Sequence, residues 1–293
     1  MLAVLFRVPR SHFRVRWGVV VRVAAVFSGG GAKAFACVGA WQAIVEAGHD
    51  VVAIVGTSFG AVVGAALGAG RTPDDLAAGL GGLSRKDVAA IDPWAIVKGI
   101  FATHVLKPDG LKRVIARLVP AARFAELRIP LTVTATNLDT GELTLFGAGG
   151  RNDASLDDAL YATCALPVYF PPGAINGGRF GDGGLRAVLP LEPAQRVACD
   201  LVLAVDVGPG FDEVVPPGRP TALPALVRVH GESERIMMAA QTERAIAAWP
   251  KTAPRLVVVR AVAEREATFA VDQLARYREA GYRRTREALG ARA

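Results

Sequence analysis

The chain has 293 residues, of which 52% are hydrophobic and 21% charged, and its formal net charge is +7. This composition is that of a globular protein with a substantial core, and it excludes extensive disorder away from the chain ends. The positive charge is compatible with simple solubility or with attraction to anionic lipid head groups. Because no run of Lys and Arg is interleaved with aromatic residues, we expect no nucleic-acid partner.

The cysteines and residues 1–21 indicate in which cellular compartment the protein is expected. Cys37, Cys164 and Cys199 are odd in number and far apart, so they predict neither a disulfide framework nor a CxxC metal pair, and a reducing, cytoplasmic location is expected. Arginines interrupt residues 1–21, which therefore lack the apolar run of about 7–15 residues that a secretory signal needs. We interpret residues 1–21 as a poorly ordered basic extension and residues 22–293 as a single domain. Peripheral contact with an anionic membrane is an open alternative, whereas no stretch predicts a membrane span.

The first part of the chain alternates short apolar strands with helices. The periodicity predicts four elements, which are strands at 21–27 and 51–55 and helices at 35–47 and 58–67. This order predicts a parallel sheet with helices on both faces, that is, a three-layer α/β/α fold with a mostly parallel central sheet. Residues 72–128 are expected to be helical, with breaks at Pro93 and at Pro108-Asp-Gly110. The segment from Trp94 to Leu118 is either a lid over an acyl chain or, more simply, part of the core.

The second part continues the same pattern. Further elements are predicted as strands at 131–135, 143–146, 201–205 and 256–259, and as helices at 156–165, 223–249 and 272–289. The 143–146 strand forms a hairpin with the strand before it, and the 272–289 helix lies on the surface. Residues 174–184 are glycine-rich and are expected to be a loop with at most one strand.

Gly56-Thr-Ser58-Phe-Gly60 fits the pattern G-x-S-x-G. In this motif a sharp turn from strand to helix lifts the serine oxygen above the sheet edge, and small residues on either side let neighbouring backbone pass close. The context is the required one, because a predicted strand precedes Ser58 and a predicted helix follows it. A chance match in an Ala/Gly-rich chain is the competing interpretation. The context favours Ser58 as a nucleophile.

A second glycine-rich loop, Gly29-Gly30-Gly31, follows the first predicted strand. Consecutive glycines let backbone N–H groups converge on one point, as an oxyanion or a phosphate requires. Dinucleotide binding would need the pattern G-x-G-x-x-G and an acid at the end of the second strand; position 34 is alanine and no such acid is present. Both loops are expected at the carboxyl edge of the sheet, where one offers a nucleophile and the other hydrogen-bond donors.

The remaining requirement is a base for the serine. None of the four histidines, His12, His49, His104 and His230, lies in a glycine-rich or strand-end context. Asp182, in contrast, lies in Arg179-Phe-Gly-Asp-Gly-Gly184, where flanking glycines allow close approach. An aspartate bonded to the serine hydroxyl can accept its proton directly. Taken alone, the Asp-Gly pair is equally typical of a hairpin turn.

Together these motifs resemble the patatin-like phospholipase family. The resemblance rests on Ser28-Gly-Gly-Gly-Ala-Lys33, Gly56-Thr-Ser-Phe-Gly60 and Asp182-Gly-Gly184, in this order. It extends to four further stretches, at 135–141, 162–167, 170–172 and 203–207, and so covers roughly residues 22–260.

The resemblance implies a three-layer α/β/α domain and a Ser–Asp dyad that works without histidine. It implies Ser58 as nucleophile, Asp182 as general base, and Gly29, Gly30 and Gly31 as oxyanion donors. The implied activity is hydrolysis of acyl esters of phospholipids, lysophospholipids or neutral lipids, as a phospholipase A or lysophospholipase. We expect no cofactor and no metal.

The sequence departs from the family pattern at three places. Lys33 and Ala34 stand where the family's glycine loop has Arg and Gly, so a planar bidentate contact is in doubt. Val188 stands where Asn is common, and Thr163-Cys164 replaces a commoner Ser pair. These changes are expected to affect loop packing or substrate shape, and none removes a catalytic residue.

Two other classes remain open. One is an α/β-hydrolase that uses Ser58, Asp182 or Asp206, and His230, although only two predicted strands precede the serine. The other is a lipid- or nucleotide-binding protein that keeps the fold without turnover.

Overall fold

The computed structural model describes residues 20–214, 225–265 and 267–290, so the predicted extension over residues 1–21 lies almost entirely outside the described residues. Within them the centre of the molecule is an eight-stranded sheet of order β5-β6-β3-β2-β1-β7-β8, with β4 paired to β3. The strands are β1 (Arg22–Phe27), β2 (Asp50–Thr57), β3 (Leu131–Asn137), β4 (Leu143–Gly147), β5 (Gly173–Ile175), β6 (Gly178–Asp182), β7 (Leu201–Asp206) and β8 (Arg255–Arg260).

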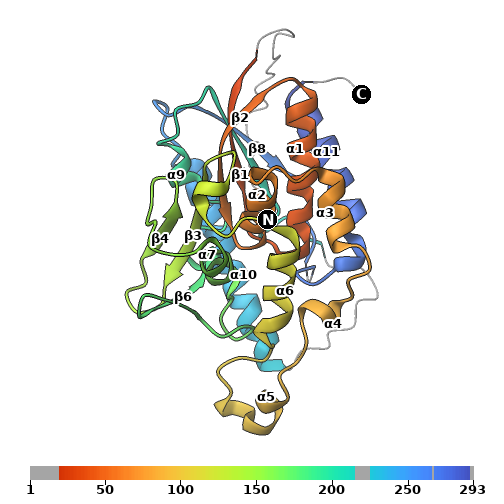
Figure 1. The fold of residues 1–293 in the computed structure, drawn as a ribbon, viewed down its shortest axis with the longest axis vertical. Helices are drawn as coiled ribbons and strands as arrows, with labels where there is room; N and C mark the ends of the chain where they lie inside the picture. Colours follow the sequence, from red (N-terminus) through yellow and green to blue (C-terminus); the bar gives the residue numbers. More distant parts are fainter. Residues whose placement is uncertain (1–19, 215–224, 266, 291–293) are drawn as a thin grey trace, which may run out of the picture.

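Helices cover both faces of this sheet (Figure 1). The α-helices are α1 (Ala36–Glu46), α2 (Phe59–Gly68), α3 (Pro73–Leu80), α4 (Arg85–Val88), α5 (Pro93–Lys98), α6 (Pro108–Leu118), α7 (Leu156–Cys164), α8 (Gly184–Ala187), α9 (Leu191–Ala194), α10 (Ala225–Ala247) and α11 (Leu274–Ala288). Short 3-10 helices are η1 (Gly31–Phe35), η2 (Gly99–Phe101), η3 (Phe124–Glu126) and η4 (Val271–Gln273). No helix of the described segments is long and apolar enough to cross a membrane.

The sheet is mixed, and its parallel part is the larger one. Strands β3, β2, β1, β7 and β8 run parallel to one another, whereas β4 and β6 pair antiparallel with β3, and β5 pairs antiparallel with β6. The two faces of β1 belong to two cores: Val23, Ala25 and Phe27 pack in the larger one, and Ala24 and Val26 face the smaller one under α9 and α10. The chain therefore has the three-layer α/β/α architecture that the alternating elements predict.

The structure corrects the prediction for residues 174–184. This stretch is a hairpin of β5 and β6 and not a loop with at most one strand. Its turn is Asn176-Gly177, in which both residues have positive φ, at 49° and 81°. Such a pair gives a two-residue turn whose twist matches that of the flanking strands. The hairpin places Asp182 at the end of β6, paired with Ala135 of β3.

The region from 72 to 128 also differs in detail from the prediction. Pro93 and Pro108 are the first residues of α5 and α6, so each marks a helix start, where the missing N–H of proline costs nothing. The segment from Trp94 to Leu118 has no single role. Helix α6 packs Val114 and Ile115 into the core, whereas α5 projects from the molecule (Figure 1).

The C-terminal helix α11 lies on the surface, as predicted, and buries one face. It packs along α1, and Tyr277 is completely buried beneath it. A Cβ at Gly39 of α1 would meet the backbone nitrogen of Tyr282 at 2.7 Å, and one at Gly281 would meet the Ala36 carbonyl carbon at 2.6 Å. The absence of side chains at these glycines allows the two helices to approach closely.

Candidate active site

Ser58 lies at the turn between β2 and α2, in a strained backbone conformation. It precedes the first residue of α2 and has φ 52° and ψ −136°, although it is not glycine. Such strain persists only where the surroundings enforce it, and it is common at functional sites. A Cβ at Gly56 would meet the Cα of Ala61 at 2.5 Å, and a Cβ at Gly60 would meet the Phe27 carbonyl oxygen at 2.7 Å. Both glycines of the G-x-S-x-G motif are therefore sterically required.

Hydrogen bonds from threonine side chains stabilise this turn. The Ser58 amide donates to Thr163 Oγ1 at 2.8 Å. Thr57 Oγ1 lies 2.6 Å from Thr134 Oγ1 and donates to the Ala187 carbonyl oxygen at 2.7 Å. The Thr163 contact gives a structural reason for the hydroxyl at this departure from the family pattern, since serine or threonine can supply the same acceptor.

Asp182 lies next to the serine. Ser58 Oγ donates to Asp182 Oδ2 at 2.7 Å, and the Gly184 amide donates to Asp182 Oδ1 at 2.7 Å. The carboxyl group is buried, and this desolvation raises the pKa of Asp182 to about 7, against the lowering effect of its two hydrogen bonds. The backbone after Asp182 passes close to β3. A Cβ at Gly183 would meet Thr134 Oγ1 at 2.5 Å, so this position needs glycine.

The glycine loop borders the same point. A Cβ at Gly29 would lie 3.2 Å from Ser58 Cβ, which places this loop against the serine. The Gly29 amide already donates to the Val188 carbonyl oxygen at 2.9 Å. No hydrogen bond of the described residues engages the amides of Gly30 and Gly31. A Cβ at Gly30 would meet the Val207 carbonyl oxygen at 2.6 Å, so this residue also must be glycine.

Lys33 anchors the end of this loop. Its Nζ donates to Glu213 Oε1 at 2.9 Å and to the Glu264 carbonyl oxygen at 2.8 Å. The side chain is buried, and desolvation lowers the pKa of Lys33 in spite of the Glu213 carboxylate. The contact is a single-point ion pair and not a planar fork, in line with the loss of bidentate geometry expected from lysine.

Helix α10 packs over the segment that follows Asp182. Gln241 Nε2 donates to the Leu185 carbonyl oxygen at 2.7 Å, and a Cβ at Gly184 would lie 3.5 Å from Met238 Cε. One turn earlier, the buried carboxylate of Glu234 contributes to raising the pKa of Asp182. No motif in the sequence marks this helix as part of the site, because its polar residues are typical of an ordinary solvated helix face.

None of the described histidines, His49, His104 and His230, hydrogen-bonds to Ser58. His230 Nε2 lies 3.2 Å from Glu234 Oε1, one helical turn away on α10. Instead, Ser58 Oγ donates to Asp182 Oδ2, and the Ser58 amide donates to Thr163 Oγ1. Asp206, the other acid considered for a histidine-based triad, pairs with Arg260 Nη1 at 3.1 Å. The arrangement therefore lacks the Ser–His contact that a triad requires.

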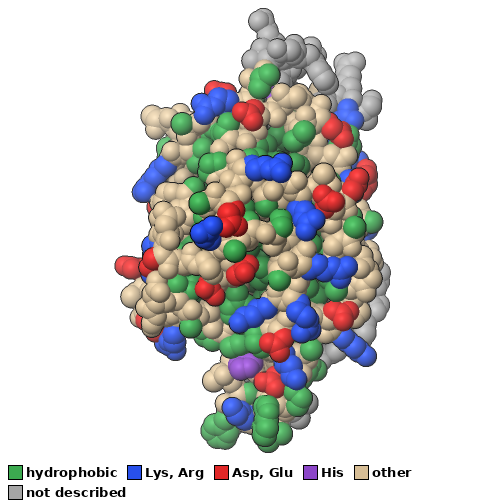
Figure 2. Space-filling view, viewed as in Figure 1, with side chains coloured by type: hydrophobic (Ala, Val, Ile, Leu, Met, Phe, Trp, Pro, Cys, Tyr) green, Lys and Arg blue, Asp and Glu red, His purple; other side chains and the backbone are tan. Residues whose placement is uncertain are grey.

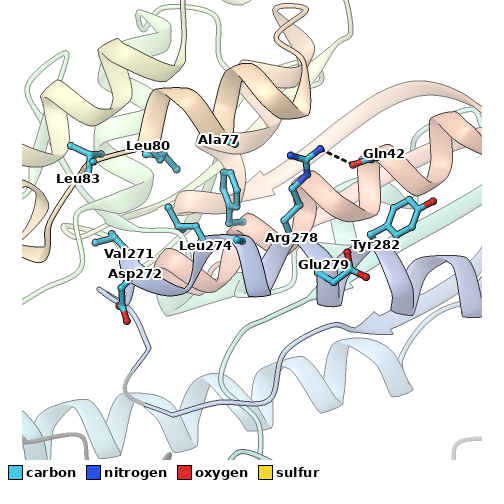
Figure 3. Close-up of a pocket in the computed structure, with 14 residues that line it drawn as sticks. Gln42, Ala77, Leu80, Leu83, Val271, Asp272, Leu274, Arg278, Glu279 and Tyr282 are labelled. Atoms are coloured by element: carbon cyan, nitrogen blue, oxygen red, sulfur yellow. Dashed lines mark hydrogen bonds between the residues drawn. The ribbon is translucent and has the colours of Figure 1, made fainter.

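Other features of the structure lie away from this site. In the part of the chain described, no group of three or more His, Cys, Asp or Glu side chains could hold a metal ion. A cleft of about 740 Å³ opens between α3 and α11, lined among others by Leu80, Leu274 and Arg278 (Figure 3). Neither Ser58 nor Asp182 lines it, and the hydrogen bond from Arg278 to Gln42 crosses one side of it.

The protein thus belongs to the class of three-layer α/β/α proteins. Its Ser58 lies at a strained strand–helix turn and is hydrogen-bonded to Asp182. The Patatin-like phospholipase family model matches residues 25–194, and the chain belongs to this family. An uncharacterized NTE family protein of Mycobacterium tuberculosis is 34% identical over 208 residues, covering 69% of this chain and 55% of the relative. Patatin-like phospholipase domain-containing protein 7 of Rattus norvegicus is 28% identical over 193 residues, covering 64% of this chain and 14% of the relative.

This chain thus spans about half the length of the mycobacterial relative and a small part of the rat protein. Among solved structures, VipD from Legionella pneumophila aligns with 93% of this chain and 67% of its own, with a TM-score of 0.48 and 18% identity.

Proposed function

We propose that this protein is a serine acyl hydrolase of lipids, with Ser58 as nucleophile and Asp182 as general base. The observation that carries the proposal is the 2.7 Å hydrogen bond from Ser58 Oγ to the buried Asp182 carboxylate, at a strained turn beside a glycine loop. Membership of the patatin-like phospholipase family supports a lipid ester as substrate. We infer the substrate class to be phospholipids, lysophospholipids or other acyl esters.

The reaction is an acyl transfer in two halves. Asp182 Oδ2 accepts the Ser58 proton while Oγ attacks the ester carbonyl carbon. The tetrahedral intermediate collapses, its bond to the alcohol breaks, and Asp182 returns the proton to the leaving alcohol or lysolipid. Water then gives a proton to Asp182 while its oxygen attacks the acyl carbon of the acyl-enzyme. The bond from this carbon to Ser58 Oγ breaks, the fatty acid leaves, and Asp182 returns the proton to Ser58 Oγ.

The glycine loop supplies the oxyanion donors in this proposal. Donors aimed at developing negative charge are among the largest contributions to catalysis. The amides of Gly30 and Gly31, which no hydrogen bond among the described residues engages, are the ones suited to this role, since the Gly29 amide donates to the Val188 carbonyl oxygen. Of the three glycines that the motif implies, Gly29 thus contributes close backbone approach beside Ser58 and not a donor.

The environment of Asp182 suits a base that works without histidine. An ordinary carboxylate is a weak base at neutral pH, and efficient proton transfer requires a pKa near the working pH. Burial raises the pKa of Asp182 to about 7, which brings its basicity close to that of a catalytic imidazole. Activity should therefore increase as pH rises through about 7, where the carboxylate forms.

Fatty-acid release from a panel of phospholipids, lysophospholipids and neutral lipids tests this proposal. Wild type should release fatty acid, whereas Ser58→Ala and Asp182→Asn should lose at least about a thousandfold in kcat/KM. His230→Ala serves as the control and should retain activity. Loss of activity in His230→Ala together with full activity in Asp182→Asn would favour a histidine-based mechanism.

A further inference from the structure

The segment of residues 91–107, here called the tip, presents large apolar side chains to solvent. It contains α5 and η2 and projects from one end of the molecule (Figure 1). Trp94, Val97 and Phe101 are 68%, 75% and 81% exposed. Figure 2 shows hydrophobic side chains gathered at this end, with basic side chains among and above them. Clustered exposed apolar side chains of this size mark an interaction site.

Hydrogen bonds join the chain at the two ends of the tip, residues 90–92 and 105–107, which together are called the neck. The Asp92 amide donates to the Val105 carbonyl oxygen, and the Lys107 amide donates to that of Ala90, each at 2.9 Å. His104 Nε2 lies 3.4 Å from Asp92 Oδ2 across the same neck. These contacts close the segment into a compact projection, so its apolar side chains are displayed by a defined backbone.

A chain of contacts links the base of the tip to the glycine loop. The Leu106 amide donates to the Tyr169 carbonyl oxygen at 2.9 Å. The Tyr169 ring lies 6.1 Å from that of Phe269, and the neighbouring Thr268 carbonyl oxygen accepts the Ala32 amide beside the glycine loop. Figure 1 places the tip beyond the carboxyl ends of the parallel strands, the edge at which Ser58 lies. The tip and the reactive serine therefore occupy the same end of the molecule.

The charge around the tip is mainly positive. Basic side chains of residues 84–117 outnumber acidic ones, and those exposed to solvent include Arg85, Lys86, Lys98, Lys107, Lys112 and Arg113. Apolar and aromatic side chains surrounded by Lys and Arg are typical of surfaces that lie in the interface of a bilayer. Juxtamembrane basic residues add attraction to anionic lipid.

We propose that the tip docks the protein on an anionic phospholipid bilayer, with Trp94, Val97 and Phe101 entering the interface and Lys98 and Lys107 contacting head groups. This inference rests on the proposed function, because a lipid substrate makes the bilayer the partner. Docking at this end brings the membrane surface to the edge that carries Ser58, which shortens the path of a lipid into the site.

Vesicle sedimentation with the full chain tests the docking independently of catalysis. The probes are vesicles of phosphatidylcholine alone and of phosphatidylcholine mixed with phosphatidylglycerol. The triple variant Trp94→Ser/Val97→Ser/Phe101→Ser should bind the mixed vesicles on the order of a hundredfold more weakly than wild type. Lys98→Glu/Lys107→Glu should bind them about twentyfold more weakly at low salt and should bind neutral vesicles as wild type does.

The matched control is Val20→Ser/Val45→Ser, which removes exposed apolar side chains at the opposite edge of the sheet. It should bind vesicles as wild type does. Ser58→Ala should also bind normally, so binding is measured separately from turnover, and a catalytically inactive wild type would not affect the result. The triple variant should keep its activity on a water-soluble short-chain ester. Unchanged vesicle binding by the triple variant, equal loss in the control, or no binding by wild type would overturn the proposal.

Discussion

The substitution Asp182→Asn should stabilise the fold while it removes activity. Asp182 is buried with a pKa of about 7, whereas the ordinary carboxyl pKa is 3.8. At neutral pH the ionised Asp182 carboxylate is therefore less stable in the folded protein than in the unfolded chain. Asparagine has nearly the same shape, its carbonyl oxygen can accept the Gly184 amide, and its amide group can donate to Ser58 Oγ.

The size and pH dependence of the gain follow from the linkage between protonation and folding. A difference of about 3 pKa units corresponds to roughly 4 kcal/mol, which is an upper bound because asparagine rebuilds the hydrogen bonds imperfectly. A raised carboxyl pKa costs the folded state nothing below the unfolded pKa, where the acid is protonated in both states. The cost grows as pH rises from about 4 to about 7 and is constant above that.

Urea unfolding of both proteins at about pH 4 and about pH 8 measures this difference. The free energy of unfolding of Asp182→Asn should exceed that of wild type at the higher pH by about 2–4 kcal/mol and by little at the lower pH. Asp139→Asn is the control, because Arg179 lowers the pKa of the exposed Asp139 carboxyl, and no gain is expected there. A destabilised Asp182→Asn at the higher pH, or an equal gain at both pH values, would refute the reasoning.

Two further substitutions test other parts of the site. Glu234→Gln removes a carboxylate that raises the pKa of Asp182, so the acid limb of the pH profile of kcat/KM should move to lower pH. The control Glu232→Gln, on the exposed side of α10, should leave this profile unchanged. An unmoved acid limb in Glu234→Gln would contradict the coupling between Glu234 and Asp182. Gly60→Ala introduces a Cβ against the Phe27 carbonyl and should lower the free energy of unfolding by about 3 kcal/mol in urea titrations, whereas Gly231→Ala, with its nearest atom at 3.6 Å, should not. Equal stability of Gly60→Ala and wild type would show that the turn can open.

The sequence predicts most of the fold and singles out Ser58 and Asp182, the two side chains that the structure joins by a hydrogen bond. The strand before Ser58 and the apolar helix after it are local signals, and both are confirmed. Asp182 could be selected because glycines surround it, although its distance from Ser58 depends on long-range pairing of β6 with β3. What the sequence predicts poorly is the hairpin at Asn176-Gly177, since glycine-rich composition is typical of both loops and tight turns.

Other features depend on contacts between remote segments and leave no local signal. The Val188 carbonyl oxygen accepts the Gly29 amide from another part of the chain, so only the structure shows that this amide of the glycine loop is already hydrogen-bonded. Thr163 supports the serine amide from the end of α7, and Glu234 approaches Asp182 from α10. The periodicity of residues 94–118 likewise does not separate the buried helix α6 from the exposed tip.

The most direct test of the central claim is labelling with a fluorophosphonate probe, followed by mass spectrometry of the adduct. A phosphonylated serine forms only where a nucleophile is activated, so the probe reports the Ser58–Asp182 pair without any assumption about the lipid. We predict one adduct on Ser58, none in Ser58→Ala, a strongly slowed reaction in Asp182→Asn and an unchanged one in His230→Ala. Wild type that stays unlabelled under conditions in which it is folded, or label on another residue, would contradict the account.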